Sequence, residues 1–214
     1  MQTQSYVRHG ERRVQSGFTL MELMVVLAVV GVIMGFAVPN FSLYIRNSRL
    51  TGAANDLLAS VTMARSEAIK RQLPVGVCAS ADPNVANPVC SGATATAFRQ
   101  GWIVWVDADN DWVPDNNVNE PVLDRHPALD VSLTVRSNNS RRIRYLANGF
   151  SSAAGPFGAN TSNIAMCDAR GTDPTIAGVS AARALRITAT GRPRVTKIQA
   201  DVNAALAVIN ANCP

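Results

Sequence analysis

The chain has 214 residues, of which 47% are apolar and 16% are charged, with four cysteines and fourteen glycines. This composition excludes an intrinsically disordered or collagen-like chain, and the length excludes a small disulfide scaffold. The net charge of +5 is unevenly distributed: residues 73–130 contain two basic and eight acidic residues, whereas residues 131–214 contain ten basic and three acidic ones. This division into an acidic and a basic part is a first indication of function.

An apolar run of 21 residues, Phe18–Val38, lies near the N-terminus, and Thr19 and Glu22 are its only distinctly polar side chains. A helix of this length spans roughly 30 Å, enough to cross a membrane. A buried core helix is the alternative, but core helices are seldom apolar on every face for so long. Because three arginines precede the run, we expect a single transmembrane helix at 18–38 with a cytoplasmic N-terminus and an exported remainder.

The start of this run forms a distinctive string. Ser16-Gly17 ends a polar leader, Phe18-Thr19-Leu20-Met21-Glu22 follows, and no A-x-A cleavage site closes the apolar run. The string Gly-Phe-Thr-Leu-x-Glu ahead of a long apolar segment resembles the class III leader of type IV prepilins. The resemblance implies that residues 1–17 are a leader, that prepilin peptidase cleaves between Gly17 and Phe18, and that the new Phe18 amine is methylated.

Glu22 places a carboxylate in a segment expected to lie in lipid, where ionisable groups are costly and usually functional. The prepilin resemblance implies a partner for it, the cationic Phe18 amine of a neighbouring subunit. Phe18 and Glu22 would then serve filament assembly in the inner membrane. The alternative is that Glu22 lies close enough to the membrane surface to be hydrated.

Residues 39–73 continue the helix in amphipathic form. Leucine, valine and alanine recur at helical spacing along one stripe, and Leu73-Pro74 ends the pattern. We therefore expect one helix of about 55 residues that begins in the membrane and ends in the exported part. The apolar stripe consists of Leu50, Leu57, Val61, Ala64 and Ala68.

From residue 74 to residue 214 the sequence consists of short β-prone runs separated by Gly, Pro, Asn and Asp. We expect a β-rich periplasmic head, with a mainly antiparallel sheet packed on the amphipathic half of the long helix, which is an α+β fold. Asp201–Ile209 is expected to be a short last helix or a tail. The expected strands are Val75–Ala79, Trp102–Val106, Val122–Asp124, Val131–Val135, Ile143–Leu146, Ile164–Cys167, Leu185–Thr190 and Arg194–Ile198.

Two internal segments narrow the family. Met63–Arg71 followed by Val75–Cys78, and Gly101–Asp107, resemble the FimT/FimU/GspH group of minor pilins and pseudopilins, most closely its FimT members. The resemblance implies the pilin fold and a partnership with other pilins. It leaves three roles open: a DNA-binding pilin of the FimT kind, a FimU-like subunit that primes pilus assembly, and the H pseudopilin of a type II secretion system.

All four cysteines lie in the part expected to be exported to an oxidising compartment, and four cysteines allow three pairings. We favour Cys78–Cys90, which closes a loop rich in Pro and Asn, and Cys167–Cys213, which ties the tail to a strand. Free or metal-bound thiols are the alternative, but the spacings do not resemble those of a zinc site.

The acidic part shows no recognisable catalytic or metal site. Asp107–Asp111 begins like a calcium loop, but that loop needs Gly at its sixth position and Glu at its twelfth, which are Trp112 and Val118 here. We therefore expect a solvated acidic hairpin that binds no metal. We also expect no cofactor and no enzyme activity, since His126 lies in a turn-like string without a nucleophile motif. Trp102 and Trp105 should lie on opposite faces of a strand, with one of them partly exposed.

The basic part contains the string Thr190-Gly191-Arg192-Pro193-Arg194. Gly permits a tight turn and Pro fixes φ, which reduces the entropy lost when the turn becomes ordered. In an extended segment Arg192 and Arg194 would point the same way, about 6–7 Å apart. This separation is close to the roughly 6–7 Å step between successive phosphates of a nucleic acid, so the string suits phosphate contacts.

The Gly-Arg-x-Arg string also resembles the C-terminal motif of FimT-type minor pilins, which bind DNA for uptake in natural transformation. The resemblance implicates Gly191, Arg192 and Arg194, with Lys197 as a neighbour. Because aromatic residues are absent from this stretch, we expect weak, sequence-independent binding to the phosphate backbone. The alternative is a solvated hairpin or a surface that pairs with another minor pilin.

Overall fold

The computed structural model describes residues 17–91, 97–138, 142–152 and 162–213, and the chain divides into two compact units, Met1–Leu43 and Tyr44–Pro214. Helix α1 (Leu20–Arg71) has 52 residues and ends where Gln72 adopts a left-handed conformation (φ 56°), two residues before Pro74. Lys70 and Arg71 lie in its last turn, where positive charge is favoured. The predicted long helix is confirmed, with an end two residues before the expected one.

Sheet A is antiparallel and follows the order β3-β2-β1-β5-β6. The two central strands β1 and β2 are buried along their whole length, which agrees with their continuous apolar sequences. Its strands are β1 (Val75–Ala79), β2 (Trp102–Val106), β3 (Val122–His126), β5 (Arg142–Tyr145) and β6 (Ser151–Ser152). A short 3-10 helix, η1 (Ala97–Gln100), precedes β2.

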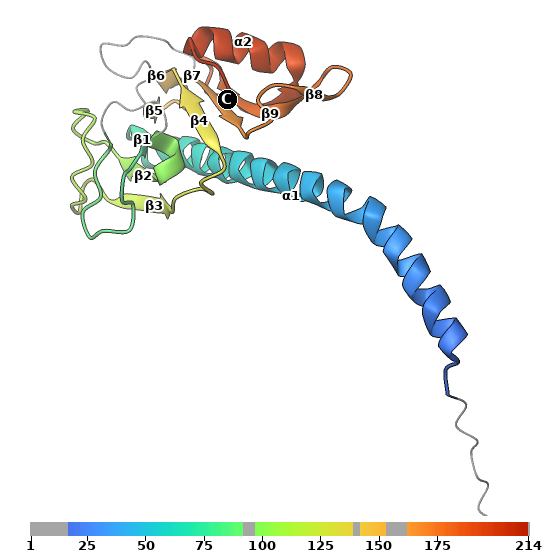
Figure 1. Cartoon of the computed structure of the whole chain (residues 1–214). Coiled ribbons are helices and arrows are strands. Elements are labelled where there is room, and N and C mark those ends of the chain that lie inside the picture. Colours follow the sequence, from blue (N-terminus) through green and yellow to red (C-terminus); the bar gives the residue numbers. More distant parts are fainter. Residues whose placement is uncertain (1–16, 92–96, 139–141, 153–161, 214) are drawn as a thin grey trace, which may run out of the picture. The chain divides into compact units, whose positions relative to one another are not determined.

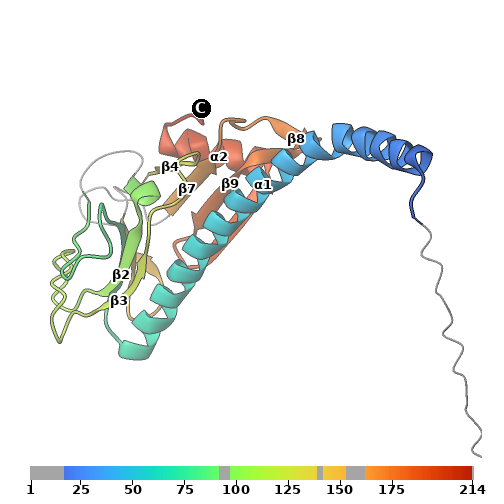
Figure 2. The ribbon, with the colours of Figure 1, turned by 60° about the horizontal axis from the view of Figure 1, so that its bottom comes forward.

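Sheet B is also antiparallel and has the order β10-β9-β7-β4, with β8 paired to β9. Helix α2 (Gln199–Ile209) follows β10 directly and lies beside β9 in Figures 1 and 2. The expected last helix is therefore a helix and not a tail. The strands are β4 (Thr134–Ser137), β7 (Ser162–Cys167), β8 (Pro174–Ile176), β9 (Val179–Ile187) and β10 (Pro193–Ile198).

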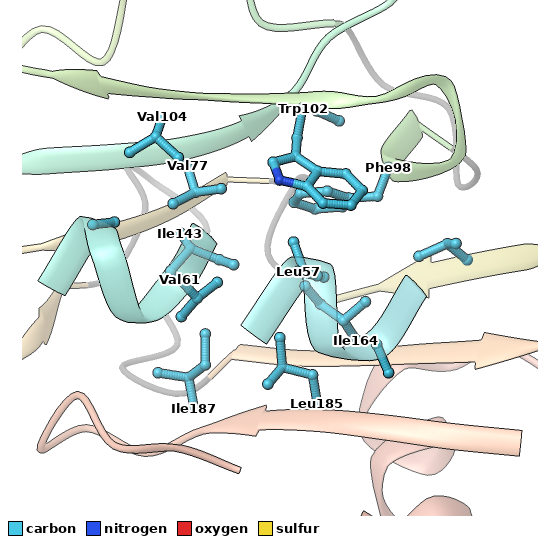
Figure 3. Packing of buried hydrophobic residues seen from close by; sticks show 14 of the residues in the cluster. Leu57, Val61, Val77, Phe98, Trp102, Val104, Ile143, Ile164, Leu185 and Ile187 are labelled. Carbon is cyan, nitrogen blue, oxygen red and sulfur yellow. The ribbon is translucent and has the colours of Figure 1, made fainter. Parts of the chain in front are cut away.

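The core of the second unit lies between the two sheets and the C-terminal part of α1. The predicted apolar stripe of this helix is confirmed, since all five of its residues are fully buried. In Figure 3, Leu57 and Val61 lie between Val77 of sheet A and Leu185 of sheet B. One helix face thus packs against two antiparallel sheets, which confirms the predicted α+β fold.

The outer face of sheet A carries a second small cluster, and here one prediction was wrong. Trp102 and Trp105 do lie on opposite faces, but both are 0% exposed. Trp102 belongs to the main core and stacks on His126 with ring centroids 3.8 Å apart. Trp105 packs over Gly76, its cross-strand neighbour, and is covered by the segment that carries Cys90.

Candidate functional site

The Gly-Arg-x-Arg string lies in the turn between β9 and β10 and at the start of β10. Gly191 donates its N–H to the carbonyl of Thr188 (2.8 Å), and Thr188 donates to the carbonyl of Arg192 (3.2 Å). The hydroxyl of Thr188 also accepts the N–H of Arg192 (3.3 Å). Gly191 has φ of 77°, a conformation that side chains rarely adopt. The turn is therefore held by its own hydrogen bonds.

The turn at Gly149 and helix α1 both contact this turn and stabilise it. The Arg65 guanidinium donates to the carbonyls of Gly149 (3.1 Å) and Thr190 (3.2 Å). A Cβ on Gly191 would lie 2.0 Å from the Gly149 carbonyl oxygen and 3.0 Å from the Tyr145 ring. Only glycine fits at this close approach, so the position of the turn is fixed relative to the core.

Two arginines on adjacent strands lie next to this turn. Arg194 of β10 is directly opposite Arg186 of β9, and the two side chains are 69% and 47% exposed. Both approach Asp201 of α2, with N–O distances of 3.7 Å and 3.9 Å. They line a cavity of about 290 Å³ together with three polar side chains, Asn163 of β7, Thr188 of the turn and Thr196 of β10.

Of the three basic residues predicted from the sequence to bind DNA, the structure places only one in this cavity. Arg192 is exposed and belongs to the turn, because β10 begins at Pro193. Lys197 is exposed and lies at the register shift between Thr196 and Ile198. The cavity includes Arg194 but neither Arg192 nor Lys197. Sequence reasoning missed Arg186, which only the strand register brings opposite Arg194.

Other arginines of the basic part are engaged within the fold. Arg144 is 3% exposed, and its Nε lies 3.2 Å from Oδ2 of Asp107. Burial lowers the pKa of Arg144 and raises that of Asp107. Arg170 forms hydrogen bonds with both carboxylate oxygens of Asp168. Arg183 donates to the carbonyls of residues 180–182. Only some of the arginines in the basic part, among them Arg186, Arg192 and Arg194, are therefore exposed to solvent and open to an external anion.

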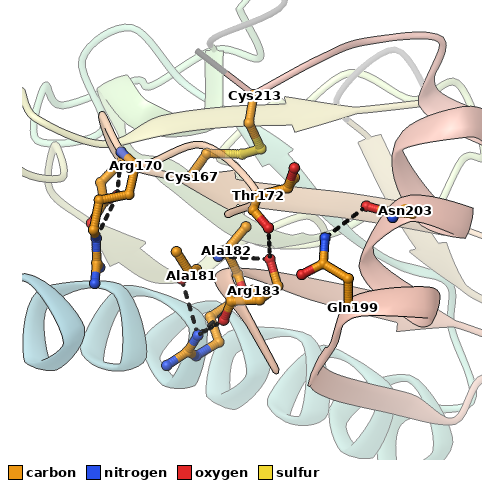
Figure 4. The surroundings of a disulfide bond; sticks show 11 residues. Cys167, Arg170, Thr172, Ala181, Ala182, Arg183, Gln199, Asn203 and Cys213 are labelled. Atoms are coloured by element: carbon orange, nitrogen blue, oxygen red, sulfur yellow. Dashed lines mark hydrogen bonds and ion pairs between the residues drawn. A yellow bond between two sulfur atoms is a disulfide. The ribbon is translucent and has the colours of Figure 1, made fainter. Parts of the chain in front are cut away.

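Both favoured cysteine pairs are disulfide-bonded. Cys78 is joined to Cys90, and Cys167 is joined to Cys213, with Cα–Cα distances of 5.6 Å and 5.7 Å. Figure 4 shows the second bond linking the end of β7 to the chain after α2. It holds the helix that carries Asp201 against sheet B, and therefore against Arg186 and Arg194.

The N-terminal unit presents the predicted processing and assembly residues. Phe18 is 86% exposed, and Glu22 lies in the first turn of α1, where its N–H donates to the Thr19 hydroxyl (3.2 Å). The segment Leu20–Ala37 has a mean hydropathy of 2.5 and is long and apolar enough to span a membrane. None of it is buried in the structure. This exposure of a long apolar helix is expected for a segment that is buried by surroundings outside the chain.

Comparison with protein families gives two matches. A family described as "Type II transport protein GspH" matches residues 53–191, which is more than half of the chain. A family described as "Prokaryotic N-terminal methylation motif" matches residues 12–38. The first match includes β1–β9 and residues 53–71 of α1, and the second includes Gly17, Phe18 and Glu22.

Similar curated proteins are pilus subunits. The chain is 36% identical over 78 residues to the type IV major fimbrial protein FimA of Dichelobacter nodosus, covering 36% of this chain and 46% of that protein. It is 36% identical over 61 residues to the type IV major alpha-pilin of Moraxella bovis, covering 28% and 38%. These matches span less than half the length of either relative.

The crystal structure of the minor pilin FimU of Pseudomonas aeruginosa is similar over 72% of this chain and 92% of that one, with 21% identity and a TM-score of 0.48.

Proposed function

The chain belongs to the GspH family of type IV minor pilins and pseudopilins, and we propose that it is a minor pilin that binds DNA through its phosphates for uptake in natural transformation. In this proposal the chain has a structural and binding role and catalyses no reaction. The apolar helix anchors it in the inner membrane, with the N-terminus in the cytoplasm and the head in the periplasm. It assembles with other pilins into a pilus.

Processing and assembly use the N-terminal residues. Prepilin peptidase removes residues 1–17, and the freed Phe18 amine is methylated. The cationic amine then pairs with Glu22 of a neighbouring subunit, which removes the cost of a lone carboxylate in lipid. The methylation-motif match and the apolar segment Leu20–Ala37, none of which is buried, support this assignment.

The observation that carries the DNA role is the pair Arg186–Arg194 beside a braced turn. Both guanidinium groups are exposed, they occupy directly opposed strand positions, and Arg192 follows in the turn. Guanidinium groups bind phosphate in bidentate fashion, and a fixed backbone reduces the entropy lost on binding. The site has no aromatic platform in its lining, so contacts are made to the phosphates and not to the bases.

Two other roles predict a different result. A pilus-priming subunit or a secretion pseudopilin, which the name of the matched family favours, binds pilin subunits and needs no affinity for DNA. Each of these roles would leave the basic β9–β10 end as a protein-pairing surface.

The test is a titration of fluorescent duplex DNA with the full chain in a neutral detergent. We expect binding at micromolar to submillimolar levels at low salt, and at least a tenfold loss in the double variant Arg186→Gln/Arg194→Gln. The charge-matched control is Arg49→Gln/Lys70→Gln, which removes two exposed cations of α1 and should retain most of the affinity. Equal losses in both variants, or no binding by the wild type, would reject the DNA role.

A further inference from the structure

The connection between β2 and β3 brings three carboxylates to one point. One carboxylate oxygen from each of Asp107, Asp109 and Glu120 lies within 4.8 Å of the other two. Asp107 and Glu120 are 0% and 3% exposed, whereas Asp109 is exposed. The predicted solvated hairpin at Asp107–Asp111 is correct for the exposed Asp109 and Asp111 but wrong for Asp107, which is buried. Buried like charges at this distance repel each other unless a cation lies between them.

Glu120 is incompletely satisfied. Its Oε1 accepts the backbone N–H of Asp109 (2.9 Å). Its Oε2 is buried and, within the part of the chain that the structure describes, has no hydrogen-bond partner. Buried carboxylate oxygens almost always have a partner, so an oxygen without one in the protein calls for a water or an ion.

The nearby cation does not balance the group. Arg144 lies 3.2 Å from Asp107 and stacks over the Trp112 ring at 4.4 Å, so its charge is directed to one carboxylate. The guanidinium of Arg142 also reaches the connection, where it donates to the Trp112 carbonyl (2.8 Å). Two cations thus face five acids, since the same connection adds Asp111 and Asp115. The loop therefore keeps an excess of negative charge that a divalent cation would neutralise.

An access route and further oxygen ligands adjoin the carboxylates. A cavity of about 310 Å³ is lined by Asp109 and Glu120 together with Asp115, Asn117 and Asn119. Carboxylate and amide oxygens are the ligands of hard cations. Oxygens on opposite sides of Mg²⁺ lie at most about 4.2 Å apart, whereas around Ca²⁺ they reach about 5 Å. The three carboxylate oxygens lie within 4.8 Å of one another, which is inside the span of Ca²⁺ ligands.

We propose that the β2–β3 connection binds a calcium ion, with Asp109 and Glu120 as ligands, Asp107 completing the carboxylate set and waters filling the remaining positions. Sequence analysis rejected a calcium loop because positions six and twelve do not fit. Glu120, at the fourteenth position from Asp107, supplies the carboxylate that the twelfth position lacks. The site is independent of the proposed DNA-binding surface.

The test uses the full chain in a neutral detergent, with Tb³⁺ as a luminescent probe that is excited through tryptophan. Trp112 is close enough to serve, because its backbone N–H donates to the Asp107 carboxylate (3.3 Å). We expect Ca²⁺ to displace Tb³⁺ and to raise the melting temperature, and Mg²⁺ at the same concentration to do much less. Asp109→Asn and Glu120→Gln should lower Ca²⁺ affinity at least tenfold. Asp173→Asn, which removes an exposed carboxylate outside the loop, is the control and should leave it unchanged.

Three results would overturn the proposal. One is a wild-type melting temperature that Ca²⁺ does not change up to several millimolar. Another is an Asp109→Asn variant whose affinity for Ca²⁺ is undiminished. This test holds even if Glu120→Gln unfolds the loop, because the exposed Asp109 side chain can be replaced without unfolding it. The third is an equal response to Mg²⁺, or an equal loss in Asp173→Asn, which would identify the binding as adventitious.

Discussion

Arg194 and Arg186 occupy directly opposed positions on β10 and β9, and both guanidinium groups approach the same carboxylate, that of Asp201. The carboxylate holds the two like charges together, but it also competes with any anion that would bind them. This relationship makes the charge state of residue 201 a determinant of anion affinity.

Asp201→Asn should therefore increase the affinity for duplex DNA by about two- to fivefold at low salt, since it removes one negative charge from a partly solvated site. The same change weakens the hydrogen bond from the Thr196 hydroxyl and removes a favourable charge from the first turn of α2. We expect a stability loss of about 0.3–1 kcal/mol from this helix effect. Fluorescence titration and chemical denaturation measure the two effects, and a lower affinity would contradict the assignment.

Gly191→Ala should destabilise the head by about 1–3 kcal/mol, because the strained φ and the overlap with the Gly149 carbonyl force the turn to move. Gly178→Ala is a matched control, since Gly178 has a similar φ of 78° but no heavy atom near its Cβ position. It should cost only about 1 kcal/mol. Urea denaturation of both variants gives the difference, and equal costs would show that the close approach at Gly191 is unimportant.

The two disulfides should differ in their contribution to stability. Cys167–Cys213 closes a sequence separation of 46 residues and Cys78–Cys90 one of 12. Loop-closure entropy predicts losses of about 4 and 3 kcal/mol for the respective double Cys→Ala variants. Thermal unfolding with and without reductant measures them, and a reductant should no longer affect a variant that lacks both bonds. A larger loss for the shorter loop would contradict this ordering.

Asp168 should contribute to the acid limit of stability. Burial acts to raise the pKa of this carboxyl, but its hydrogen bonds with Arg170 hold the pKa below the usual value. A group whose pKa is lowered on folding stabilises the fold above its unfolded pKa of about 3.9, and the contribution is lost as the pH falls through the folded pKa. Asp168→Asn should therefore reduce stability at pH 7 and flatten its decline below about pH 4. Asp173→Asn, at an exposed position, should leave the profile unchanged.

Much of the fold follows from periodicity. The stripe from Leu50 to Ala68 predicts the buried face of α1, and the apolar runs Val75–Ala79 and Trp102–Val106 predict the central strands of sheet A at their observed bounds. These elements are predictable because burial on one or both faces dictates their residue types. The first six residues of β9, Val179–Ala184, were not predicted as a strand because an alanine-rich sequence carries little strand preference.

The candidate sites were less predictable, since they depend on register and burial. Arg186 becomes a partner of Arg194 only through the β9–β10 pairing, and Arg192 leaves the strand because β10 begins at Pro193. Trp105 is buried because the loop tied by Cys78–Cys90 covers the outer face of sheet A. No local pattern in the sequence encodes such coverage.

The salt dependence of DNA binding tests the central claim most directly. The full chain and the double variant Arg186→Gln/Arg194→Gln are titrated with fluorescent duplex DNA across a series of salt concentrations. Log K should fall linearly with log salt, with a slope of about −0.9 for each phosphate contacted. The variant should lose about two contacts from that slope. Identical slopes for the two proteins, or no binding at low salt, would contradict DNA capture and leave an assembly subunit of a pilus or secretion pseudopilus.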